Sequence, residues 1–120
     1  MKIAFTTSGN DLNAPLDSRF GRAPKFLIYD TDSSTFEVVD NGQNLNAAQG
    51  AGIQSAQNIA RLGAQTLVTG HCGPKAFRVL ISADIKIFNT SAGTVKEALE
   101  LYMAVKLAES TSADVEGHWV

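Results

Sequence analysis

Cysteine is almost absent from this chain of 120 residues, which contains Cys72 and no other. A single thiol cannot form an internal disulfide. Together with two histidines it cannot complete a structural zinc site without carboxylates or a second chain. The low cysteine content therefore indicates a reducing compartment, and we expect a cytoplasmic protein.

Long apolar runs and an excess of basic charge are also missing. No run approaches the roughly 20 apolar residues of a membrane-spanning helix, and the chain turns polar at Thr7, so we expect no signal peptide. The net charge of -2 argues against binding to nucleic acid or to an anionic membrane. Because neither GxxxxGK[ST] nor GxGxxG after a strand occurs, we expect no nucleotide cofactor.

The hydrophobic pattern changes from strand-like to helix-like along the chain. The expected strands are 2–6, 25–30, 35–40, 66–69 and 85–89, and the expected helices are 51–62, 74–82 and one that follows Thr94. Helical spacing places Ile81 and Val105 on buried helix faces, and Phe36 is expected in the sheet core. Thr94 and Glu97 have the spacing of a capping box.

This order of elements predicts an α/β fold, in which a mixed five-stranded sheet of order 3-2-1-4-5 is flanked by helices. We expect one domain over residues 1–109 and a loosely held tail over residues 110–120. Four loops, 7–24, 41–49, 70–73 and 90–93, follow strand ends at the same edge of the sheet. Ligands of open α/β sheets bind at such an edge.

A glycine-flanked turn lies between the fourth strand and the helix that begins at Pro74. Proline suits the first helical position, and the N-terminus of a helix attracts anions. The turn therefore predicts an anion-binding cradle that contains a thiol. Its candidate residues are Gly70, His71, Cys72, Gly73, Pro74 and Lys75.

Two further segments are expected at the same edge. Arginines in the long first loop can bind a multi-oxygen or multi-sulfur anion, although Arg19 could instead pair with Asp17, with Arg22 facing solvent. Phe20 is a candidate apolar wall, and the loop after the fifth strand can offer backbone N–H groups. The candidate residues are Arg19, Phe20, Gly21, Arg22, Thr90, Ser91, Ala92, Gly93 and Thr94.

The role of Cys72 stays open at this point. Beside a helix N-terminus its thiolate is favoured, so it could contact a metal or act as a nucleophile assisted by His71, and it could equally be a small buried residue. A ribonuclease H-like layout also raises nuclease activity, but the first and fourth strands carry no carboxylate to hold Mg²⁺. A protein-interaction module remains a further alternative.

Four motifs, taken together and in order, resemble the dinitrogenase iron-molybdenum cofactor biosynthesis family over about residues 1 to 105. They are Arg19-Phe20-Gly21-Arg22, Gly50-Ala51-Gly52-Ile53-Gln54, Thr69-Gly70-His71-Cys72-Gly73-Pro74-Lys75-Ala76-Phe77 and Gly93-Thr94-Val95-Lys96-Glu97-Ala98. The resemblance implies a ribonuclease H-like three-layer fold without nuclease function and without enzymatic activity. It also implies association with other proteins, including ATPases linked to cell-division positioning.

The resemblance further implies that the chain binds or carries a metal-sulfur cluster, here a molybdenum-copper sulfide anion held without covalent attachment. Charge would come from Arg19, Arg22 and Lys75. Cys72 is the candidate copper contact, although family members often have an apolar residue at that position.

Overall fold

The computed structural model describes residues 1–41 and 50–112. Its elements are β1 (Lys2–Thr7), the short 3-10 helix η1 (Phe20–Arg22), β2 (Lys25–Asp30), β3 (Thr35–Asp40), α1 (Ala51–Arg61), β4 (Thr66–Thr69), α2 (Pro74–Ser82), β5 (Lys86–Asn89) and α3 (Val95–Met103). The five strands form one sheet in the order β3-β2-β1-β4-β5. β1 is antiparallel to β2 and parallel to β4, and β5 is parallel to β4. The predicted mixed sheet and its strand order are confirmed.

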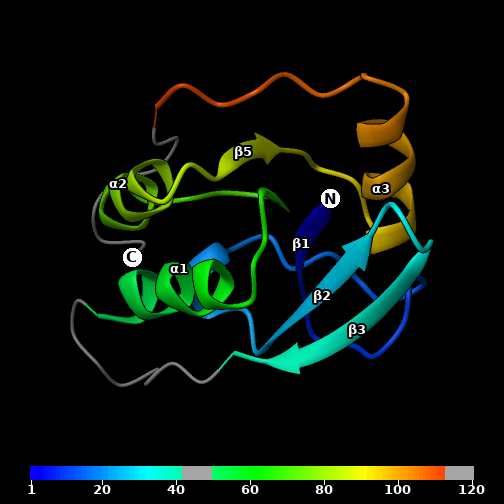
Figure 1. The fold of residues 1–120 in the computed structure, drawn as a ribbon, viewed down its shortest axis with the longest axis horizontal. Coiled ribbons are helices and arrows are strands. Elements are labelled where there is room, and N and C mark those ends of the chain that lie inside the picture. The colour runs from blue at the N-terminus through cyan, green and yellow to red at the C-terminus, as the bar shows by residue number, and fades with distance from the viewer. Residues whose placement is uncertain (42–49, 113–120) are drawn as a thin grey trace.

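Helices cover both faces of the sheet and complete a three-layer fold. Figure 1 shows α1 and α2 on one face and α3 on the other. The side chains of β1 alternate between these layers: Ala4 packs in the cluster beneath α1 and α2, whereas Ile3 and Phe5 pack beneath α3. Burial of a side chain such as Ile3 or Phe5 contributes about 1.5–3 kcal/mol, and the central strand thus packs against both helical layers.

Local signals in the sequence explain where the helices begin and end. Gly63, with φ of 82°, follows α1 in the left-handed conformation that glycine adopts without strain. Thr94 caps α3, since its Oγ1 accepts the Glu97 N–H at 3.1 Å and donates to Glu97 Oε1 at 3.3 Å. Pro74 is the first residue of α2. The predicted cap and the proline position are confirmed.

Three side chains that were expected in the core are exposed. Ile81 is 44% exposed on α2, and Val105 is 88% exposed because α3 ends at Met103, before it. Phe36 is 40% exposed because β3 is an edge strand. Periodicity assigned these residues to inner faces. The end of α3 leaves Val105 uncovered, and the edge position of β3 leaves Phe36 uncovered.

The end of the described chain lies along the outer edge of β5. Ser110 donates its N–H to the Ile87 carbonyl oxygen at 2.7 Å, and Phe88 forms a β-bridge with Glu109. Figure 1 shows this segment running beside β5. The predicted tail over residues 110–120 is described only as far as residue 112. In the described part of the chain, no helix combines the length and apolar character needed to cross a membrane.

Candidate functional site

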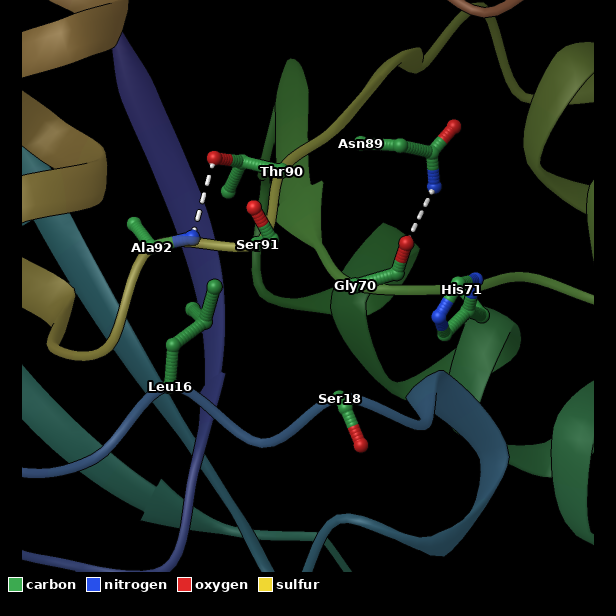
Figure 2. A pocket seen from close by; sticks show the side chains of 8 residues that line it. All are labelled: Leu16, Ser18, Gly70, His71, Asn89, Thr90, Ser91 and Ala92. Carbon is green, nitrogen blue, oxygen red and sulfur yellow. Dashed lines mark hydrogen bonds between the residues drawn. The ribbon is translucent and has the colours of Figure 1, made fainter.

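A pocket of about 510 Å³ lies where the loops after β1, β4 and β5 meet (Figure 2). Because these three strands are parallel, their carboxyl ends share one edge of the sheet, as expected. The volume is in the range of small-molecule sites. The lining residues are Leu16, Ser18, Gly70, His71, Asn89, Thr90, Ser91 and Ala92. The predicted rim loop 41–49 lies outside the described residues except for Asn41.

Two walls of the pocket, the loop after β1 that carries Ser18 and the turn after β4 that carries Gly70, touch through their backbones. A β-carbon on Gly70 would lie 2.5 Å from the Ser18 carbonyl oxygen, so this position requires glycine. One residue further, Arg19 and His71 form a β-bridge, and the Phe20 N–H donates to the His71 carbonyl oxygen at 3.1 Å. In Figure 2 the Ser18 hydroxyl points away from the loop that follows β5, so Ser18 contributes its backbone to the wall. The predicted arginine loop and the glycine turn are therefore brought together.

A pair of buried hydroxyl groups holds the loop after β1, which forms one wall of the pocket, against the sheet. Thr6 and Thr69, both 0% exposed, have their Oγ1 atoms 2.8 Å apart. Thr6 Oγ1 also donates to the Asp17 carbonyl oxygen at 2.7 Å. Because a hydroxyl has one proton, Thr69 must donate to Thr6. This chain of hydrogen bonds joins β4, β1 and the loop that carries Ser18.

The third wall, residues 89–92, uses several of its polar groups internally. Asn89 Nδ2 donates to the Gly70 carbonyl oxygen at 3.1 Å, the Thr90 N–H donates to Thr69 at 3.0 Å, and the Ala92 N–H donates to Thr90 Oγ1 at 3.2 Å. The sequence predicted that the loop over residues 90–93 would supply N–H groups to an anion. The N–H groups of Thr90 and Ala92 instead form hydrogen bonds within the protein, to the Thr69 carbonyl oxygen and to Thr90 Oγ1.

The predicted cations do not line the pocket. Arg19 is exposed beside His71, Arg22 is half-buried in η1, and Lys75 is half-buried in the first turn of α2. Asp17 Oδ1 accepts the backbone N–H of Arg19 at 3.0 Å, and across the described residues no ion pair joins these two side chains. The pocket wall is thus mainly neutral, with positive charge nearby.

Cys72 does not face the pocket, contrary to its expected role as a copper contact. The residue is 2% exposed and belongs to the core cluster beneath α1 and α2, together with Ala76 and Leu80. Its thiol donates weakly to the Gly73 carbonyl oxygen at 3.7 Å. The chain turns after His71 so that Cys72 points inward, and the buried thiol lacks the access that a metal contact or a nucleophile needs.

Phe20 and Gly21 also point into the protein. Phe20 is 1% exposed and packs against Phe26, with ring centroids 5.9 Å apart, so it is a core residue and not the expected apolar wall. A β-carbon on Gly21 would lie 3.0 Å from the Gly52 α-carbon, which explains the close contact between η1 and α1. Through these contacts with the protein interior, both residues fix the position of the segment that carries Arg19 and Arg22.

The remaining candidates occupy structural positions at the edges of the site. Gly73 is buried and caps α2, Pro74 begins that helix, and Thr94 caps α3. Gly93 is exposed, and its carbonyl oxygen accepts the Leu16 N–H at 3.1 Å. The residues that line the pocket from these segments are Gly70, His71, Thr90, Ser91 and Ala92.

Sequence reasoning missed Leu16, Ser18 and Asn89 as lining residues. Each lies within three residues of a predicted motif or loop, but all three are neutral and of types that carry no chemical signature. The available signal was their position, since Asn89 ends β5 and Leu16 and Ser18 lie in the loop that follows β1. Among the described residues that line the pocket, His71 is the one histidine, cysteine, aspartate or glutamate.

Comparisons with known proteins agree with the resemblance seen in the sequence. The model of the family described as dinitrogenase iron-molybdenum cofactor matches residues 1–105. The structure of the apo form of the orange protein from Desulfovibrio gigas is similar, with 36% identity, a TM-score of 0.91, and coverage of 95% of this chain and 96% of that one.

Two further relatives cover nearly the whole chain. A putative NifB protein from Thermotoga has 30% identity and a TM-score of 0.80, with coverage of 95% of this chain and 97% of that one. An uncharacterized protein of Methanocaldococcus jannaschii is 29% identical over 110 residues, which is 89% of each chain. The family match over residues 1–105 includes all the residues that line the pocket.

Proposed function

Because this chain belongs to the dinitrogenase iron-molybdenum cofactor family, we propose that its pocket binds or carries an anionic metal-sulfide cluster, without catalysing a reaction. The proposed guest is a molybdenum-copper sulfide. The observation that carries the proposal is the pocket of about 510 Å³ at the carboxyl edge of β1, β4 and β5. The likeness to the orange protein, whose structure is described as an apo form, supports it.

The chemistry of the wall suits a guest that brings its own sulfide ligands. Sulfides on the surface of a cluster are large, polarizable acceptors, which can contact apolar groups and accept weak hydrogen bonds. Leu16 offers an apolar surface, while Ser91 offers a hydroxyl and an N–H that forms no hydrogen bond with the described chain. Such a wall can hold a cluster without supplying a full set of metal ligands.

The predicted cations supply long-range attraction. Arg19 follows the lining residue Ser18, Arg22 lies in η1 and Lys75 in the first turn of α2, and none of the three lines the pocket. Charges in this arrangement raise the local concentration of an anion and speed its association, and salt screens the effect. In this proposal the arginines guide the cluster to the pocket, and the neutral wall retains it.

The buried position of Cys72 weighs against the alternative of a thiol-dependent enzyme, since a substrate cannot reach a side chain that is 2% exposed. The association with cell-division ATPases and the cytoplasmic location remain predictions from the sequence.

Reconstitution tests the proposal directly. The protein is incubated with tetrathiomolybdate and copper, desalted, and examined for visible charge-transfer bands and for bound molybdenum and copper. We expect both metals to remain with the protein. A colourless, metal-free protein after desalting would reject the proposal.

A variant that fills the pocket ties retention to this site. Ser91 is exposed and lines the pocket, so Ser91→Trp should reduce the retained metal by about tenfold or more, as expected for lost contacts of roughly 1.4 kcal/mol or more. The matched control is Ser33→Trp, at the exposed turn between β2 and β3. Equal retention by the two variants would place the guest elsewhere.

A further inference from the structure

We propose that two copies of this chain pair through their α3 helices, which lie antiparallel to each other. The inference goes beyond the proposed function and does not depend on it. Among the described residues α3 is the one helix on its face of the sheet, so its outer side has no helical neighbour (Figure 1). The most exposed large apolar side chains of the described chain, Met103 at 57% and Val105 at 88%, lie at the C-terminal end of this helix. An exposed apolar patch of this kind marks an interaction surface.

Val105 adopts a backbone conformation that is unfavourable for valine. Its φ is 57°, in the left-handed region, where a β-branched residue is an outlier. The Lys106 N–H donates to the Leu101 carbonyl oxygen at 2.9 Å, and the Val105 N–H donates to that of Tyr102 at 3.0 Å. In this type of helix end, glycine usually occupies the position of Val105. Because the side chain of Val105 is almost fully exposed, packing within the described chain does not offset the strain. Strained residues cluster at functional sites, and contact with a second molecule would bury this side chain.

The charges around the apolar patch make the surface complementary to itself. A groove of about 380 Å³ lies along α3, and its lining residues are Glu97, Glu100, Leu101, Ala104 and Lys106. Carboxylates therefore lie toward the start of the helix and an ammonium group lies beyond its end, with Leu101 and Ala104 between them. When two such surfaces meet around a two-fold axis, with the helices antiparallel, the acidic end of each opposes the basic end of the other. A second copy of the chain thus fits both the charges and the apolar centre.

Glu100 is the carboxylate that we expect to meet Lys106 of the second copy. Glu97 takes part in the cap of α3, because its Oε1 accepts the hydroxyl of Thr94 at 3.3 Å. Glu100 and Lys106 are both exposed, and within the described residues neither forms an ion pair. The two-fold axis produces this contact twice in each dimer.

The pairing should be weak because the surface is small. α3 has 9 residues and is thus about 14 Å long. Its outer side therefore buries less than the roughly 800 Å² per partner of a standard interface. We expect monomers at micromolar and dimers toward millimolar concentration, and less pairing at high salt. In sedimentation equilibrium of the 120-residue chain, the average mass should rise above 12.7 kDa with concentration. A mass that stays at that of one chain overturns the proposal.

Two substitutions test the apolar part of the surface. Met103→Glu should weaken association at least about tenfold, an ordinary loss for an apolar side chain at the centre of an interface. The matched control is Ile81→Glu, because Ile81 is 44% exposed on α2, on the opposite face of the sheet, and should leave association unchanged. Val105→Gly should raise the melting temperature, since glycine adopts this conformation without strain, and should weaken association. Association that is unchanged in both Met103→Glu and Val105→Gly would overturn the assignment of this surface.

A mixing experiment separates pairing between copies from effects within one chain. Glu100→Lys places lysine opposite lysine, and Lys106→Glu places glutamate opposite glutamate. Each variant alone should therefore associate at least about tenfold more weakly than the unmodified protein. In an equimolar mixture, both contacts of a mixed dimer regain opposite charges, and association should return. Thermal unfolding of each variant shows that it is folded. Recovery in the mixture supports the proposal, whereas a mixture that associates no more strongly than the separate variants contradicts it.

Discussion

The backbone of Ser18 packs directly against the α-carbon of Gly70, so closely that a β-carbon on Gly70 would lie 2.7 Å from the Ser18 α-carbon. This contact joins the loop after β1 to the turn after β4, and the pocket lies beside it. Because the atoms in contact belong to the backbone, they cannot move aside as the end of a flexible side chain would. The separation of two pocket walls thus depends on one missing methyl group.

Gly70→Ala should therefore lower the free energy of unfolding by about 1–3 kcal/mol, the usual cost of overpacking, and weaken retention of the cluster. The matched control is Gly93→Ala, in the loop after β5, where the nearest atom to a new β-carbon is Glu97 Oε1 at an ordinary 3.8 Å. Urea unfolding and metal retention measure the two effects. Equal stability of the two variants would show that the contact at Gly70 relaxes at little cost.

The buried hydroxyl pair should behave as a coupled unit. Thr6→Val removes the donor to the Asp17 carbonyl oxygen and the acceptor of Thr69, and unsatisfied buried groups cost about 1–3 kcal/mol. Thr69→Val leaves the bond from Thr6 to Asp17 intact and should cost less. In the double variant only Asp17 loses its partner, so the combined loss should fall short of the sum by about 1 kcal/mol.

A double-mutant cycle by urea unfolding measures this coupling, with the exposed Thr35→Val as the control. Strictly additive losses from Thr6→Val and Thr69→Val would show that the two hydroxyl groups are not coupled.

Cys72 should resist alkylation in the folded protein. Since its side chain is 2% exposed, iodoacetamide reaches it only when the structure opens, and native labelling should be at least about 100-fold slower than labelling in denaturant. The control is an exposed thiol, Ser91→Cys in a Cys72→Ala background, which should react rapidly. Mass spectrometry follows both. Comparable native rates for the two thiols would mean that Cys72 reaches solvent, and would restore it as a candidate ligand.

Phe20 and Phe36 should differ sharply in their contribution to stability. Phe20→Ala removes a side chain that is 1% exposed and packs on Phe26, so it should cost about 3–5 kcal/mol. Phe36 is 40% exposed on an edge strand, and Phe36→Ala should cost clearly less. Urea unfolding compares them. If Phe20→Ala instead weakened cluster retention without loss of stability, Phe20 would be the apolar wall that the sequence first suggested.

The elements of the fold could be predicted because each has a strong local signal. The bounds of β2, β3, β4 and α2 agree with the sequence pattern residue for residue, and the pairing of Thr94 with Glu97 marks the start of α3. The strand order followed from connection rules that apply to any sheet of this kind. These features depend on neighbouring residues, which a single sequence displays.

The directions of side chains at the site could not be predicted in the same way. Cys72 lies in the turn after β4 and Phe20 begins the short helix η1, where strand alternation no longer assigns a face, and both pack in the core cluster beneath α1 and α2. Asn89 and Leu16 have ordinary side chains, and only the meeting of three loops makes them part of the pocket. The sequence therefore predicted the edge of the sheet at which the pocket lies, but several of the residues that it named do not line that pocket.

The segment beside β5 has a consequence for any shortened form of the chain. The family match ends at residue 105, whereas Glu109 and Ser110 bind the outer edge of β5. A protein trimmed at residue 105 would keep all the strands and helices of the described residues but would present unpaired main-chain groups of β5 to other molecules. Exposed strand edges of this kind promote pairing between chains. Such a fragment should thus tend to precipitate at concentrations at which the 120-residue chain stays dissolved.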